Sequence, residues 1–257
     1  MTVLLAEMTR ERIRQIAPDS IAVLPTASVE QHGPHLPVIT DTLLCGTVAQ
    51  RAAESATSQA SVVVAPVLCY CNSHHHRPFP GVLSLSSPTY MAAVTEILEG
   101  LVLSGFRKLV VLNGHGGNTD SNRVVGLDFV NRLGHPVSIA TASYWDIARP
   151  AIVAAGIMPG ERIPGHAGRF ETALVMAIRP DLVDPQGLAQ TRDQSTGSAG
   201  LFADLAGGTV QAHGTWGASA GYSDHPAAAT AAEGQAMLDI IVARVAAFLA
   251  AFGGLSS

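Results

Sequence analysis

Short apolar runs alternate with segments of helical pattern along most of the chain. The apolar runs have the length of buried strands and lie at 21–25 (IAVLP), 61–68 (SVVVAPVL), 108–112 (KLVVL) and 136–145 (PVSIATASYW). The helical segments follow them at 41–56, 87–104, 118–133 and 170–178. Strands that are apolar throughout and alternate with helices are typical of a parallel sheet covered on both faces. The pattern therefore predicts an α/β fold with a mainly parallel sheet.

Two of the predicted helices have recognisable start signals. Thr40 or Asp41 can cap the helix over 41–56. Ser87 followed by Pro88 places a capping residue and then a proline at the first helical position, which predicts that the next helix begins there.

The last apolar segment, 236–252, is predicted to be a packed helix and not a membrane span. Asp239 and Arg244 interrupt its apolar run. Its apolar face repeats with a period close to 3.6 residues, through Met237, Ile241, Val245, Phe248 and Phe252. The N-terminal stretch has no apolar core after a basic start, so we expect neither a signal peptide nor a membrane partner.

Composition narrows the class of protein further. The 257 residues are expected to form a single domain, over 1–257. Only 14% are charged and 47% are hydrophobic, which suggests extensive burial, including surface hidden in a homo-oligomer. A net charge of −5 without a Lys/Arg run argues against a nucleic-acid partner. Three cysteines without a CxxC pair fit a reduced, cytoplasmic chain.

Histidines gather where the predicted strands end. EQHGPH (30–35), SHHHRPFPG (73–81) and NGHGGN (113–118) each follow a predicted strand, and HAGRFET (166–172) precedes a predicted helix. Seven of the ten histidines lie in these four motifs. Because ligands of open parallel sheets bind beyond the carboxyl ends of the strands, we expect these motifs to meet at one site.

The residue types in these motifs suit a metal ion. Neutral imidazole and carboxylate together favour zinc, manganese or iron. Glu30 and His32 are two residues apart, so on an extended backbone their side chains point the same way. Asp41 offers a carboxylate that can bridge two ions, and the glycines beside His115 let the backbone approach closely. Taken singly, each motif could instead be a hydrogen-bonded core histidine, a glycine turn or a solvated basic tip.

Four blocks of sequence resemble one known family. LPTASVEQHGPHLPVITDT, VLNGHGGN, SYWD (143–146) and HAGRFETALVMAIRPDLV (166–183) are similar, in order, to the motifs of the creatininase (creatinine amidohydrolase) family. The resemblance extends from about residue 5 to 250. It implies a three-layer α/β/α sandwich, a hydrolase that cleaves C–N bonds with two divalent ions per chain, and a hexamer.

The resemblance also implies roles for individual residues. Asp41 is the expected bridging ligand, and Glu171 is expected to act in catalysis as well as to bind metal. His166 occupies the position of the proton-transfer histidine. The implied metal ligands are Glu30, His32, Asp41, His115 and Glu171, and the implied substrate contacts are Ser73, His76 and Trp145. The loop from about 190 to 225, with Trp216, Tyr222 and His225, is a candidate to close over the site.

Two departures leave the substrate open. At the second block the creatininase sequence is similar to NGHYEN, and the glutamate of that motif binds metal. This chain has Gly117 at the position of the glutamate. A tryptophan and an aspartate expected before the HAG motif are absent, because the stretch reads Arg162-Ile163-Pro164-Gly165. A small cyclic amide or a formamide-type substrate is expected. The alternatives are a cyclic ketone such as an inosose, a precursor peptide, and a metal-binding scaffold without activity.

Overall fold

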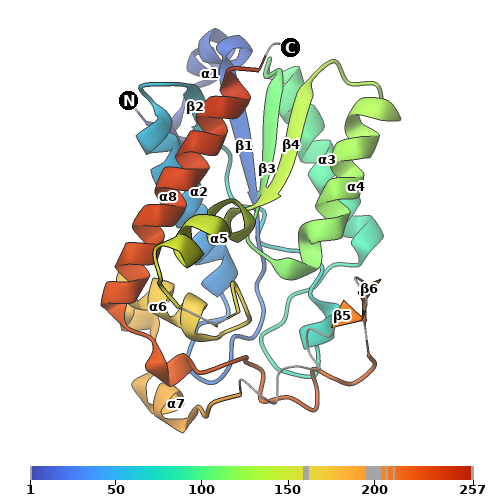
Figure 1. Cartoon of the computed structure of the whole chain (residues 1–257). Coiled ribbons are helices and arrows are strands. Elements are labelled where there is room, and N and C mark those ends of the chain that lie inside the picture. Colours follow the sequence, from blue (N-terminus) through green and yellow to red (C-terminus); the bar gives the residue numbers. More distant parts are fainter. Residues whose placement is uncertain (1, 159–161, 195–203, 206–207, 211, 256–257) are drawn as a thin grey trace.

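Four parallel strands form the central sheet of the protein, in the order β2-β1-β3-β4. The computed structural model describes residues 2–158, 162–194, 204–205, 208–210 and 212–255. Figure 1 shows the sheet with its strands pointing toward one end of the molecule. The strands are β1 (Ser20–Thr26), β2 (Ser61–Val64), β3 (Lys108–Asn113) and β4 (Ser138–Ser143). The predicted parallel sheet is confirmed.

Helices cover both faces of this sheet (Figure 1). Successive strand residues enter different cores: Val23 packs in one hydrophobic cluster and Leu24 in the other. Core residues on the first face come from α2 (Thr40–Ala56), α5 (Tyr144–Ala154), α6 (Arg169–Ile178) and α8 (Ala231–Gly253). Those on the second face come from α3 (Ser87–Leu103) and α4 (Thr119–Asn131). The architecture is the predicted three-layer α/β/α sandwich.

Short elements complete the described chain. They are α1 (Arg10–Ile16), α7 (Pro185–Gln190), the antiparallel pair β5 (Asp204–Leu205) and β6 (Gly208–Thr209), and the 3-10 turns η1 (Leu5–Glu7), η2 (Ala17–Asp19), η3 (His74–His76), η4 (Gly116–Asn118), η5 (Pro180–Leu182) and η7 (Pro226–Ala228). The segment from about 190 to 225, expected to be a loop, thus contains a short hairpin, and α7 ends where this segment begins. Its residues 195–203, 206–207 and 211 lie outside the described residues.

Two predicted strands are too long. The run 61–68 forms a regular strand only to Val64, because Pro66 has no N–H to continue the ladder. The chain nevertheless stays beside β1, since the amide of Leu68 donates to the carbonyl of Pro25 (2.9 Å). The run 136–145 ends as a strand at Ser143, and Tyr144 begins α5. That helix was not predicted because its aromatic start reads as a strand and Pro150 lies inside it.

Helix starts differ slightly from their predicted positions. Ser86, and not Ser87, caps α3 by accepting a hydrogen bond from the amide of Thr89, so Pro88 is the second helical residue. Helix α8 begins five residues before the predicted segment, at a capping box in which Thr230 accepts from the amide of Glu233 (3.2 Å).

Helix α8 packs against α2, α5 and α6 (Figure 1). By length and mean hydropathy it is also long and apolar enough to cross a membrane, a test that core helices of soluble proteins pass as well. Four residues of the predicted face are buried, and Phe248 is partly buried. The helix therefore lies where the sequence pattern predicts, against the core.

Candidate metal centre

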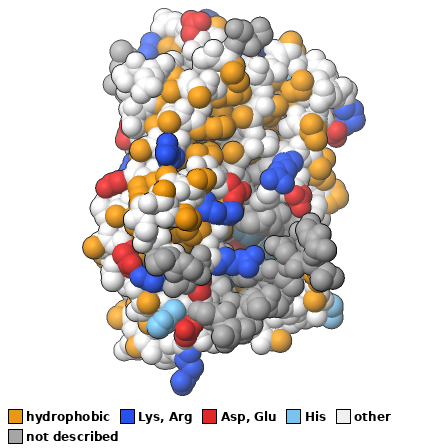
Figure 2. Space-filling model, in the orientation of Figure 1, with side chains coloured by type: hydrophobic (Ala, Val, Ile, Leu, Met, Phe, Trp, Pro, Cys, Tyr) orange, Lys and Arg blue, Asp and Glu red, His pale blue; other side chains and the backbone are white. Residues whose placement is uncertain are grey.

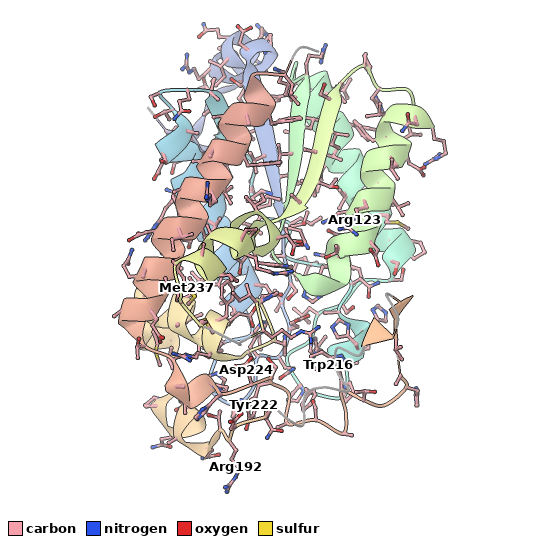
Figure 3. All side chains as sticks on the ribbon, in the orientation of Figure 1. Arg123, Arg192, Trp216, Tyr222, Asp224 and Met237 are labelled. Carbon is pink, nitrogen blue, oxygen red and sulfur yellow. The ribbon has the colours of Figure 1, made fainter. Side chains whose placement is uncertain are left out.

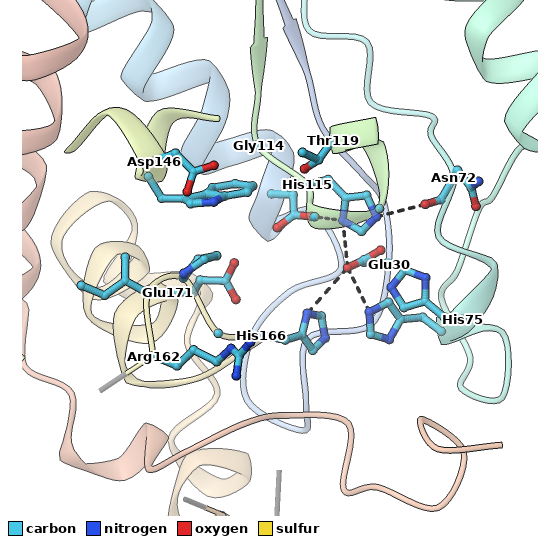
Figure 4. A pocket seen from close by; sticks show the side chains of 18 of the residues that line it. Glu30, Asn72, His75, Gly114, His115, Thr119, Asp146, Arg162, His166 and Glu171 are labelled. Atoms are coloured by element: carbon cyan, nitrogen blue, oxygen red, sulfur yellow. Dashed lines mark hydrogen bonds and ion pairs between the residues drawn. The ribbon is translucent and has the colours of Figure 1, made fainter. Parts of the chain in front are cut away.

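The histidine motifs meet in one cavity beyond the carboxyl ends of the strands. The cavity has a volume of about 630 Å³ and receives residues from the segments after β1, β2 and β3 and from the loop before α6. Figure 4 shows Glu30, His75, His115, His166 and Glu171 around it. The convergence expected from parallel-strand topology is thus present.

Asp41 lies between two histidines that come from different strands. Its Oδ1 is 3.1 Å from His32 Nε2, and its Oδ2 is 2.9 Å from His115 Nδ1. Ser28 donates a hydrogen bond to the same Oδ2 (2.8 Å). Asp41 is in the first turn of α2, so the helix fixes its position. A carboxylate that offers one oxygen to each of two imidazole ligands has the geometry of a bridging ligand.

Glu30 is a fully buried carboxylate ringed by imidazoles (Figure 4). Its Oε1 lies 3.3 Å from His76 Nε2, 3.3 Å from His115 Nδ1 and 3.7 Å from His166 Nδ1. Neither oxygen has a hydrogen-bond partner among the described residues. Burial alone would raise the pKa of Glu30, but His115 and His76 hold it well below its ordinary value. A buried carboxylate that makes no hydrogen bond, and whose nearest polar neighbours are imidazole nitrogens at 3.3 Å, fits a cation at this point.

The potential ligand atoms fall into three groups, each with its atoms within 4.8 Å of one another. The groups are His32–Asp41–Glu171, Glu30–His75–His115 and Glu30–His32–His166. The structure therefore brings all five predicted ligands together and adds His75, which the sequence analysis did not select. Imidazole and carboxylate donors of this kind fit zinc or manganese.

The first of these groups has strongly shifted proton affinities. Burial would lower the pKa of His32, but Asp41, Glu171 and Glu30 raise it to about 10. Burial raises the pKa of Glu171 to about 8, with help from the charges of Asp41 and Glu30 and against that of His32. Without a metal, both groups therefore hold protons at neutral pH, and a bound cation would take the place of those protons.

His166 has the opposite shift. Burial lowers its pKa well below the ordinary value, and the neighbouring His76 and His32 add to the effect. Its Nε2 lies 3.0 Å from the carbonyl oxygen of Gln31, to which a protonated Nε2 can donate. In that tautomer Nδ1, which faces Glu30, is free of its proton and can accept one.

Gln31 is a site residue that sequence reasoning missed. Its side-chain amide nitrogen lies 3.0 Å from His76 Nδ1 and 2.9 Å from His166 Nε2, and its Oε1 accepts from the amide of Gly33. The side-chain amide of Gln31 thus lies beside two imidazoles. It can donate to His76 Nδ1, whereas a hydrogen bond to His166 Nε2 would need the other His166 tautomer, in which Nε2 carries no proton. A signal for it was present in the EQH motif, because Gln31 stands between two expected ligands, Glu30 and His32, in the same loop.

Two of the three predicted substrate residues line the cavity. His76 and Trp145 line the cavity and are almost fully buried. Ser73 is not among the described residues that line it, and its hydroxyl is buried without a hydrogen-bond partner there. From the candidate closing loop, Trp216 does reach the site. Its ring centroid lies 4.2 Å from that of His76 and 5.0 Å from that of His166 (Figure 3).

Two other residues of that loop lie elsewhere. Tyr222 is buried, accepts a hydrogen bond from the amide of Arg192 and packs edge-on against His35, away from the cavity lining. His225 is also absent from the lining among the described residues. His35 Nε2 lies 2.9 Å from Thr172 Oγ1, within hydrogen-bonding distance, and His35 is absent from the described residues that line the cavity.

Gly117 leaves no room for a side chain. A β-carbon there would lie 2.6 Å from His115 Nε2 and less than that from the carbonyl oxygen of Asn72. The same two atoms, His115 Nε2 and Asn72 O, are 3.1 Å apart and within hydrogen-bonding distance. With His115 in this position, residue 117 cannot supply a carboxylate to the site.

Fold and site together define an α/β/α protein with clustered metal-ligand residues at the carboxyl edge of a parallel sheet. The family model for creatininase, described as creatinine amidohydrolase, matches residues 6–249. The chain belongs to the creatininase family.

Individual relatives have different names. A creatinine amidohydrolase from Pseudomonas putida is 34% identical over 185 residues, which cover 66% of this chain and 69% of the relative. A mycofactocin precursor peptide peptidase from Mycolicibacterium smegmatis is 29% identical over 242 residues, 90% of this chain and 84% of the relative. A 3-dehydro-scyllo-inosose hydrolase from Thermotoga maritima is 31% identical over 107 residues, 42% of this chain and 32% of the relative.

Solved structures agree with this assignment. A crystal structure of creatinine amidohydrolase has a TM-score of 0.82 at 28% identity and covers 99% of both chains. Similar creatininase structures include a zinc–zinc form of a variant (TM-score 0.80, 28% identity) and a manganese form (TM-score 0.79, 27% identity), each covering 96% of this chain and 97% of its own.

Proposed function

We propose that the protein is a metal-dependent amidohydrolase that cleaves a C–N amide bond of a small cyclic amide or formamide-type substrate with two divalent ions. The observation that carries this proposal is the placement of Asp41 between His32 and His115 beside the orphaned carboxylate of Glu30. Glu30, His32, Asp41, His115 and Glu171 are the proposed ligands, with Asp41 shared between the ions.

Bound divalent ions would polarise the substrate carbonyl and lower the pKa of a water molecule in the cavity. The protein's own contribution to proton transfer is assigned to His166. Its neutral imidazole accepts a proton from the attacking water at Nδ1 and returns it to the leaving nitrogen, as general base and then general acid. This role requires the tautomer in which Nε2 carries the proton and donates it to the carbonyl of Gln31, 3.0 Å away.

The two tryptophans favour a small, flat substrate. Trp145, at the start of α5, lines one part of the cavity, and Trp216 packs on the histidines. Aromatic faces bind planar amides by stacking and exclude water from the reaction. Ser73 and His76 are proposed substrate contacts, His76 because it borders the cavity and Ser73 through its unpartnered hydroxyl.

The experiment that tests the proposal is hydrolysis by protein reloaded with Zn²⁺ or Mn²⁺ after metal removal. Creatinine, hydantoin, dihydrouracil and an N-formyl amine would be compared with a cyclic ketone and a short peptide. We expect turnover of one of the four amides that disappears on chelation and in His32→Ala. Cleavage of the peptide or the ketone alone would move the function to those alternatives. Metal binding without turnover of any substrate would favour a scaffold.

We also infer that the protein forms a homo-oligomer, a hexamer by analogy with the family. The edge strand β4 is only half-buried, and Val153 of α5 is 63% exposed. Figure 2 shows hydrophobic side chains gathered on the upper half of the face that carries α8 and α5. Light scattering coupled to gel filtration gives the assembly mass directly, and a monomer would refute this inference.

A further inference from the structure

The geometry points to His75 as a protein ligand of the second metal ion, the one that Glu30 and His115 would bind. This inference rests on the proposed function, because it assumes that two ions bind. His75 lies in the SHHHRPFPG motif, but the sequence predicted no role for it, whereas its neighbour His76 was expected to contact substrate.

The positions of three donor atoms support the assignment. A ring nitrogen of His75, a carboxylate oxygen of Glu30 and a ring nitrogen of His115 lie within 4.8 Å of one another. Ligands of one zinc ion are about 3–4.5 Å from each other, because each is about 2 Å from the ion. The rings of His75 and His115, which come from two different loops, are nearly parallel, at 10° with centroids 5.8 Å apart.

The surroundings of His75 leave its nitrogens available. Among the described residues it has only ring contacts, with His76, His115 and Trp216, and no hydrogen bond or ion pair. Both other histidines of η3 are engaged: His74 Nδ1 lies 2.6 Å from Ser84 Oγ, and His76 Nδ1 lies 3.0 Å from Gln31 Nε2. Of the three, His75 alone lines the cavity with neither nitrogen committed to another described residue.

The second ion needs a further ligand because the loop after β3, which carries His115, supplies no other donor. Glu30 and His115 supply two protein ligands, and Asp41 Oδ2 lies close to His115 as a third, shared one. The position that follows His115 by two residues, Gly117, has no space for a further donor. His75 approaches from the turn after β2 and provides the missing contact.

The test is metal binding by four forms of the full-length protein after metal removal: wild type, His75→Ala, His75→Phe and His74→Ala. His75→Phe keeps a ring against His115 and Trp216 but removes both nitrogens. His74→Ala removes an imidazole of the same turn that does not line the cavity. Co²⁺ would be titrated while its visible absorption is recorded, circular dichroism would check the fold, and bound metal would be counted after dialysis.

We expect two Co²⁺ ions per chain in the wild type and in His74→Ala. In both His75 variants the first ion stays tight, and the second binds at least tenfold more weakly with an altered absorption band. Equal binding of two ions by wild type and His75→Phe would overturn the inference and leave the proposed function standing. Loss of both ions to the same extent would also overturn it. Fewer than two ions in the wild type would refute the dinuclear centre itself.

Discussion

Asp224 binds the first turn of α6, because its Oδ1 accepts a hydrogen bond from the backbone amide of Arg169 (2.7 Å). The helix has no capping side chain of its own, since Gly168 occupies the cap position. A β-carbon at Gly168 would fall inside the Asp224 carboxylate. Asp224 therefore caps α6 from a distant segment, the one that precedes α8 (Figure 3).

The same segment holds the loop of His166. Ser223 Oγ accepts from the amide of His166 (2.9 Å) and donates to Asp224 Oδ2 (2.7 Å), and the amide of Ser223 donates to the carbonyl of His166 (2.8 Å). Ala167, next in the chain, has a φ of 47°, which is unfavourable for alanine. Contacts from outside the loop thus maintain a backbone shape that positions His166 and, through α6, Glu171.

We predict that Asp224→Ala lowers the free energy of unfolding by about 1–3 kcal/mol, because buried amide donors lose their acceptor. Turnover should fall as well, whereas the KM for substrate changes little, since Asp224 does not line the cavity. Asp224→Asn keeps an acceptor oxygen and should recover part of both losses. Denaturant unfolding and steady-state kinetics check this. An unchanged turnover in Asp224→Ala would show that His166 is held by other contacts.

His166→Ala is expected to lower turnover by about 10²–10⁴-fold while the metal content stays near the wild-type value. The physical reason is that the proposed proton acceptor is removed and the ligand groups of Asp41 and Glu171 remain. Metal analysis and kinetics on the same preparation decide the matter. Because Glu30, His32 and His166 also form a group of potential ligands, a loss of metal would instead identify His166 as a ligand.

Much of the architecture followed from hydrophobic patterning, because strand burial is a local signal. The four strands, the helices α2, α3, α4, α6 and α8 and the convergence of the histidine motifs were all expected. The predicted boundaries were less accurate at the ends of two strands. Pro66 interrupts the hydrogen bonds of a strand without changing the direction of the chain. Tyr144 reads as part of a strand but begins a helix.

Contacts between distant segments could not be read in this way. Glu30, His32, Asp41 and His115 were selected from motif chemistry and from family resemblance, and the fold places them together. Gln31, His75 and Asp224 were missed because each of them contacts residues from another part of the chain. Gln31 and His166, for example, are 135 positions apart. Their side-chain types alone do not distinguish them from ordinary loop residues.

Metal binding is predicted to release protons. In the metal-free protein the pKa of His32 is about 10 and that of Glu171 about 8, so at pH 7 both groups hold a proton that a bound cation displaces. The apparent affinity should therefore rise with pH, by up to tenfold per unit for each displaced proton. Above about pH 8 the Glu171 proton no longer contributes, whereas the proton of His32 still does, and so does that of His115, whose pKa burial would lower but Glu30 raises.

Calorimetric titration with Zn²⁺ at pH 7.5, in buffers of different ionisation enthalpy, measures the number of protons released. His32→Gln removes one titrating group and should reduce that number by one, although its affinity will also be lower. An enthalpy that does not depend on the buffer would contradict the prediction, because it would mean that His32 and Glu171 are already unprotonated in the metal-free protein.

Gly117 and Gly116 provide a matched pair of substitutions in one turn. A β-carbon at 117 would collide with His115 and with the carbonyl of Asn72, whereas a β-carbon at 116 has no heavy atom within 4 Å. Gly117→Ala should therefore displace the His115 ring and weaken binding of one ion by at least tenfold, while Gly116→Ala retains both ions. Metal counting after dialysis compares them.

Gly117→Glu is expected to bind metal no better than Gly117→Ala, since the added carboxylate cannot pass the His115 ring. Recovery of full metal content in Gly117→Glu would mean that His115 can rotate aside, and the requirement for His75 as a ligand would then be specific to the glycine-containing chain.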